Sequence, residues 1–138
     1  MTEYDDLLKR AADGLPSIEK PEVKPEPKEL PWAPYYCLDR YGEPYPVFML
    51  SGVFEDRNGL RKVAVYEDKS HKAVISTVFL GLNHNWDGVN IEIWETMIFL
   101  NGEDVYCRRC GGYRENAIAM HERIVEDWRE VVLSVTEV

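Results

Sequence analysis

The stretches AVISTVFL at residues 73–80 and IEIWETMIFL at residues 91–100 decide the fold of this 138-residue chain. Both are rich in β-branched and aromatic residues, which favour pleated, half-buried strands. A third strand is expected at residues 60–66, and the polar turn Glu67–His71 joins it to residues 73–80 as a hairpin. Because the turn-forming segment GLNHNWDGVN joins residues 73–80 to residues 91–100, the three strands should form an antiparallel meander.

A helix is expected after the meander, from Tyr113 to about Val132. Its apolar stripe recurs at helical spacing and comprises Ala117, Ile118, His121, Ile124, Val125, Trp128 and Val132. An amphipathic helix must bury such a stripe, and the sheet offers an apolar face for it. The chain is therefore predicted to be an α+β protein, with an antiparallel sheet of three to five strands and a C-terminal amphipathic helix packed on it.

The chain before the meander divides into an arm and the start of the domain. Residues 3–15 have the spacing of a short helix, and six of the eight prolines then fall between Pro16 and Pro34, which is typical of an extended linker. We expect a helix-plus-linker arm at 1–33 and the α+β domain at 34–138. Residues 35–38 are predicted as a strand, whereas 47–55 combine helical spacing with an unfavourable glycine.

Composition and charge exclude several classes of protein. The net charge is −9 and basic residues occur only in short groups, so a surface that neutralises several phosphates of a nucleic acid is not expected. No run approaches the roughly 20 apolar residues that cross a bilayer. An acidic start and three cysteines favour a reducing cytoplasm, and no sequence feature calls for a cofactor.

Cys107 and Cys110 have the spacing of half a zinc knuckle. Other ligands could come only from Cys37 and the three histidines, and no second cysteine pair exists. Two cysteines that pack or flank a turn are the better interpretation, so no metal site is predicted.

The segment 81–90 is the best candidate for a binding site. It concentrates Asn83, His84, Trp86 and Asp87 in a loop at the edge of the sheet, and loops on rigid scaffolds often carry function. The same residue types also form tight turns, which is the structural alternative. Trp86 would then either contact a partner or fold back to cap the core.

Glu95 is the remaining candidate, because it shares a strand face with Met97 and Phe99 and must find a partner there. We expect His121 to be that partner, since the helix should cover this face. A catalytic pair is conceivable, but a structural ion pair is favoured. The chain has neither a G-x-S-x-G nucleophile motif nor a phosphate-binding glycine loop, so an enzyme is not the preferred expectation.

Three blocks together resemble a family of small bacteriophage and prophage proteins of unknown function. They are STVFLGLNH at residues 76–84, WETMIF at residues 94–99 and the segment from Arg109 to His121. Cys110 stands where the family tends to have tyrosine, and Met120 stands where it often has glycine. The resemblance covers roughly residues 35–130 and implies a phage origin, without implying a reaction.

The preferred functional hypothesis is a non-enzymatic accessory protein that binds a host or phage protein through the arm and the Trp86 segment. The first alternative is a binder of a small ligand, with a pocket formed by Asn83, His84, Trp86 and Glu95. A hydrolase using His84, Glu95 or His121 ranks last. We expect no nucleic acid or membrane partner, and a homo-oligomer is left open.

Overall fold

The structure, a computed structural model, describes residues 29–56 and 58–136. The helix expected at residues 3–15 and the linker up to residue 28 lie outside these residues. The described elements are β1 (Tyr35–Leu38), β2 (Pro44–Val47), β3 (Lys62–Asp68), the short 3₁₀ helix η2 (Lys69–His71), β4 (Ala73–Phe79), β5 (Trp94–Leu100), β6 (Glu103–Cys110) and α2 (Arg114–Thr136).

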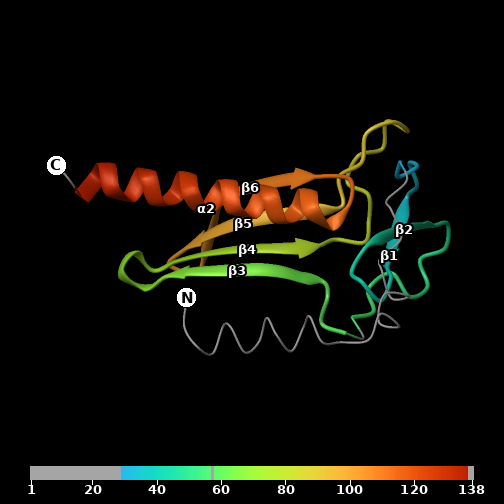
Figure 1. Cartoon of the computed structure of the whole chain (residues 1–138), viewed down its shortest axis with the longest axis horizontal. Helices are drawn as coiled ribbons and strands as arrows, with labels where there is room; N and C mark the ends of the chain where they lie inside the picture. Colours follow the sequence, from blue (N-terminus) through green and yellow to red (C-terminus); the bar gives the residue numbers. More distant parts are fainter. Residues whose placement is uncertain (1–28, 57, 137–138) are drawn as a thin grey trace, which may run out of the picture.

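The fold is α+β, as the sequence predicts. Strands β3, β4, β5 and β6 form an antiparallel sheet in chain order, and β1 and β2 form a separate two-stranded sheet. Helix α2 lies across one face of the four-stranded sheet, and the small sheet stands at one end of it (Figure 1). The other face of the four-stranded sheet is covered by no described element.

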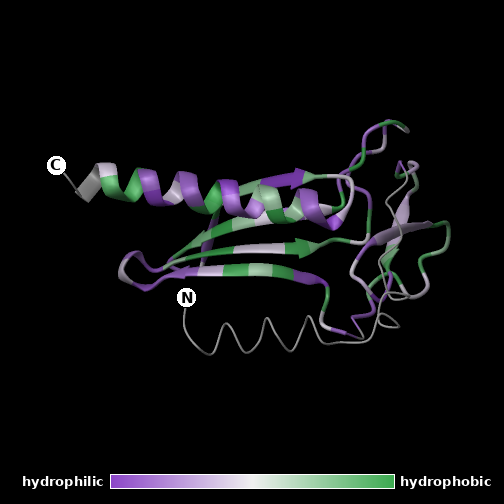
Figure 2. Cartoon of the chain, viewed as in Figure 1, coloured by the Kyte–Doolittle hydropathy of each residue, from purple (hydrophilic) through white to green (hydrophobic). Residues whose placement is uncertain are grey.

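The core lies between α2 and the sheet. Strand alternation turns every second residue of β4 and β5 towards the helix: Ala73, Ile75, Thr77, Phe79, Trp94, Thr96 and Ile98 are all buried. Trp94 is the largest of them; its ring packs on Phe79 at 5.0 Å between centroids, and its Nε1 donates to the carbonyl of Gly112 at 2.8 Å. Figure 2 shows the apolar stretches of β4 and β5 beneath a helix of mixed polarity.

Two strands escape the sequence analysis. β6 reads EDVYCRRC, and seven of its eight side chains are exposed. Its charged residues conceal the apolar alternation by which a strand is usually predicted. β2 contains Pro44 and Pro46, which disfavour a central strand but are tolerated in a two-stranded edge pair. Residues 48–54, which had helical spacing, form turns instead of a helix.

The helix corresponds closely to its prediction, with one change in its buried stripe. Ile118 is exposed, whereas Met120 is buried against the sheet beside Ala117 and Ile124. Glu43 fixes the start of α2 because its Oε1 accepts from the backbone N–H of Arg114 at 2.8 Å. That carboxylate at a helix N-terminus joins the small sheet to the domain.

The last residues assigned to the arm pack on the domain. Ala33 is fully buried, Leu30 contacts the core, and the hydroxyl of Tyr36 donates to the carbonyl of Pro31 at 2.7 Å. The packed part of the chain therefore includes Leu30.

Candidate functional site at the apolar loop end

Two long loops lie at the end of the four-stranded sheet that is next to the small sheet (Figure 1). The hydrophobic loop, Phe48–Phe54, follows β2, and the Trp86 loop, Gly81–Asn90, joins β4 to β5. We call the two together the apolar loop end. Both carry large apolar side chains in solvent, and both are tied to the core at specific residues.

The hydrophobic loop presents an apolar surface. Phe48 is 75% exposed and Met49 is 73% exposed, and Leu50 and Phe54 are at least half exposed. Between them, Val53 is buried and holds the loop against Gly81, which follows β4. The loop is therefore a fixed turn with apolar side chains directed outwards.

Gly81 allows this close approach. Its φ is +82°, and a Cβ there would lie 2.6 Å from Cγ1 of Val53, so the two loops touch where they leave the core. Arg61 reinforces the junction: its Nη1 donates to the carbonyl of Val53 at 2.6 Å and its Nη2 to that of Leu80 at 2.9 Å. Burial lowers the pKa of this guanidinium, which lies within 6 Å of the Phe54 and Phe79 ring centres.

Asn83 anchors the Trp86 loop. Its side chain is almost fully buried, and its Nδ2 donates to the carbonyl of Ala33 at 3.0 Å. Its Oδ1 accepts from the backbone N–H groups of Asn85 and Glu92, each at 3.0 Å. One amide thus closes the base of the loop and fixes it to the N-terminal segment, which is a structural role.

The tip of the Trp86 loop is ordered by Asp87. Its Oδ1 accepts from the backbone N–H groups of Val89 and Asn90, both at 2.7 Å, and these bonds lower the pKa of the carboxyl. Trp86 is 67% exposed and Val89 is 77% exposed. Trp86 therefore does not cap the core; its ring meets the edge of Trp32 at 6.4 Å between centroids.

The structure separates the predicted site residues. His84 is exposed on the Trp86 loop near Trp86 and Asp87, whereas Asn83 points into the protein. Glu95 lies on the uncovered face of the sheet, where its Oε2 accepts from Nε of Arg109 at 2.8 Å. The expected pairing of Glu95 with His121 is wrong, because the helix packs on the opposite face.

His121 belongs to a buried network on the covered face. Its Nδ1 lies 2.7 Å from Oγ1 of Thr77, which lies 2.5 Å from Oγ1 of Thr96. Burial lowers the pKa of the imidazole. These partners are hydroxyl groups of the core, so His84, Glu95 and His121 do not form one catalytic site.

Strand alternation also separates the two cysteines of β6. Cys107 pairs with Met97 on the uncovered face, and Cys110 pairs with Trp94 on the helix side. Their sulfur atoms therefore point to opposite faces of the sheet and cannot ligate one ion. Burial raises the pKa of the Cys110 thiol to about 11.

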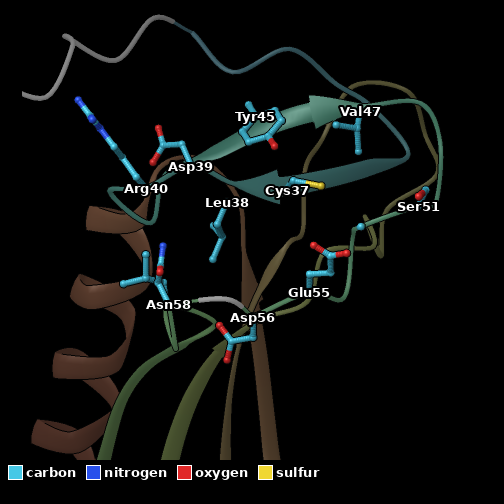
Figure 3. A pocket seen from close by; sticks show the side chains of 12 residues that line it. Cys37, Leu38, Asp39, Arg40, Tyr45, Val47, Ser51, Glu55, Asp56 and Asn58 are labelled. Atoms are coloured by element: carbon cyan, nitrogen blue, oxygen red, sulfur yellow. The ribbon is translucent and has the colours of Figure 1, made fainter.

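A cavity of about 380 Å³ lies between the small sheet and the hydrophobic loop with the chain that follows it (Figure 3). Several of its polar groups already serve local structure. Asp39 accepts from the backbone of Tyr41 and Glu43, Asp56 accepts from the backbone of Arg61, and the Arg40 guanidinium turns to Tyr41. The cavity does not include the residues of the pocket expected from the sequence.

No family model matches this chain, and neither a curated protein nor a solved structure matches it. Among the described residues, no helix has both the length and the apolar character needed to cross a membrane. The Trp86 loop is predicted from the sequence, whereas the hydrophobic loop is not, although the run VFML at residues 47–50 is a signal for it.

Proposed function

We propose that this protein is a non-enzymatic accessory protein that binds a protein partner through the apolar loop end. The observation that carries this proposal is the exposure of six large apolar side chains on two anchored loops: Phe48, Met49, Leu50, Phe54, Trp86 and Val89. Large apolar side chains are unfavourable in water, and several of them exposed at one end of a molecule commonly mark a site of interaction.

The anchoring of the loops supports a binding role. Val53, Gly81 and Asn83 fix both loops, so little loop entropy is lost when a partner binds. Tryptophan is also enriched among the residues that dominate binding energy. The partner we expect has an apolar groove or pocket that accepts Trp86 and Phe48.

The resemblance to bacteriophage proteins supports a host or phage protein as that partner. The alternative of a small ligand has less support, because Asn83 and Glu95 do not line a common pocket with Trp86. A hydrolase has the least support, since its candidate groups lie on different faces of the sheet.

The experiment is quantitative affinity capture from phage-infected bacterial cells, with the full chain as bait. We expect a protein that the wild type enriches and that Phe48→Ser and Trp86→Ala both lose. Leu133→Ser is the matched control, because Leu133 is also an exposed apolar residue but lies near the end of α2. Equal enrichment by the wild type and both loop variants would refute the proposal.

A further inference from the structure

Strand β6 exposes the longest free edge of the four-stranded sheet. It has eight residues and pairs only with β5, and within residues 29–56 and 58–136 no strand pairs with its outer side. Such an edge presents N–H and C=O groups that can pair with another strand. This surface is separate from the apolar loop end.

The charges of β6 are arranged in an unusual order. Glu103 and Asp104 stand at its start, Arg108 and Arg109 stand near its end, and Val105-Tyr106-Cys107 lies between them. Edges that avoid pairing commonly carry charges that repel a second copy. In an antiparallel pair of β6 strands this order of charges attracts a second copy, because the acidic start of each strand meets the basic end of the other.

The register of β6 on β5 identifies the residues that would meet. Glu103 pairs with Leu100 and Arg108 pairs with Thr96, so both lie on the face that carries α2. Glu103 and Arg108 are five positions apart, so regular alternation would place them on opposite faces. The irregularity in the pairing at Ile98 and Phe99 brings them onto one face. Arg108 and Glu103 are both exposed, and neither takes part in a described ion pair of the chain.

We propose that β6 pairs antiparallel with β6 of a second copy of this chain, giving a two-fold dimer with a continuous eight-stranded sheet. Glu103 of each copy then faces Arg108 of the other, twice, and the two-fold axis passes between Val105 and Tyr106. Opposite charges that face each other across strands stabilise the pairing. On the opposite face of the sheet, Asp104 of each copy faces Cys107 of the other.

The edge is short, so the dimer is expected to be of moderate affinity. An interface built on one strand lies at the lower end of the usual size range, and we expect a dissociation constant of about 1–100 µM. The full chain should therefore shift from monomer to dimer over that range in sedimentation equilibrium. A monomer at about 500 µM would overturn the proposal.

Charge exchange tests the register. Glu103→Lys places like charges opposite each other, and so does Arg108→Glu, so each variant alone should weaken dimerisation at least about tenfold. An equimolar mixture of the two should recover a dimer. In that mixed dimer the introduced lysine faces the introduced glutamate, and the native Arg108 of one copy faces the native Glu103 of the other. Circular dichroism checks that both variants remain folded.

Arg123→Glu is the matched control for Arg108→Glu, since it makes the same change in net charge but lies on the solvent side of α2. It should dimerise like the wild type. A dimer that survives both single variants, or a mixture that stays monomeric, would refute the pairing through β6. The dimerisation test is independent of the proposed function, because variants of the apolar loop end that lose the partner should still dimerise through β6.

Discussion

The two ends of the four-stranded sheet differ in the length and chemistry of their connections. At one end, β3 joins β4 through Lys69–Lys72 and β5 joins β6 through Asn101–Gly102, and these turns carry polar residues. At the other end, the hydrophobic loop and the Trp86 loop are long and apolar at their tips. Short polar turns are sufficient to reverse a strand, so the Trp86 loop, which joins the paired strands β4 and β5, exceeds what the fold requires.

The two ends are also stabilised in different ways. At the short-turn end, Asp68 accepts from the ring of His71 and from Nε1 of Trp128, so a side chain of α2 contacts the turn. At the apolar loop end, buried residues hold the bases of the loops and leave their tips in solvent. The contrast implies that the bases of the loops determine stability, whereas the proposed binding role rests on the tips. Changes at the bases should therefore alter the unfolding free energy more than changes at the tips.

Asn83→Ala should be the most destabilising of these changes. It removes the partners of two backbone N–H groups and one carbonyl, and we expect a loss of about 2–4 kcal/mol in the free energy of unfolding. At the short-turn end, Asn101 has a positive φ, which asparagine adopts more easily than alanine. Asn101→Ala should therefore lower the free energy of unfolding by only about 1 kcal/mol. Urea denaturation measures both; equal losses would remove the distinction between the two ends.

Gly81→Ala should have the next largest effect. The new methyl group adds a clash with Val53 to the strain of a positive φ, and we expect a loss of about 1–3 kcal/mol. Gly102→Ala has the same strain but nothing within 4 Å of the added Cβ, so its thermal unfolding midpoint should fall less. A larger fall for Gly102→Ala would show that the contact between the loops is not structural.

Protonation of Asp87 should loosen the tip of the Trp86 loop. Bonds from Val89 and Asn90 lower its folded pKa below the usual 3.8, so its contribution to stability is present above that pH and is lost as the pH falls through the folded pKa. The Val89 and Asn90 amide signals should therefore shift at pH values below 3.8 in an NMR titration. Asp87→Asn should abolish that shift; a midpoint above 3.8 would contradict the geometry.

Leu50→Ser and Leu133→Ser should have the smallest effect on stability. Leu50 is 50% exposed and Leu133 is 59% exposed, so each change should alter the free energy of unfolding by less than about 0.5 kcal/mol. A large loss for Leu50→Ser in calorimetry would show that the tip of the hydrophobic loop is part of the core.

The sequence predicts the α+β architecture well because its signals are local. β4, β5 and α2 follow from β-branched runs and from a helical stripe. The choice of the covered face is wrong because Met97 and Phe99 are more apolar than Thr77 and Thr96, yet the threonines face the helix. Their hydroxyl groups bond to each other and to His121, and no pattern in one strand reveals such a long-range network.

The candidate site is only partly predictable for the same reason. Trp86 stands out in a loop of turn-forming residues. Its exposure excludes the capping role, and its contact role stays a prediction. The spacing of a buried helix face belongs to Val47, Leu50, Val53 and Phe54. Only the fixing of Val53 beside Gly81 shows that Leu50 and Phe54 remain in solvent. β6 is not predicted from the sequence because it is a charged strand at the edge of the sheet, where an apolar alternation is not needed.

The most direct test of the proposed binding role is the dissociation constant of the captured partner, measured by titration calorimetry with wild type and Trp86→Ala. We predict a loss of at least about 2 kcal/mol, or roughly 30-fold in affinity, with the unfolding midpoint nearly unchanged. An unchanged dissociation constant together with a large fall in the unfolding midpoint would contradict the account, since Trp86 would then be structural.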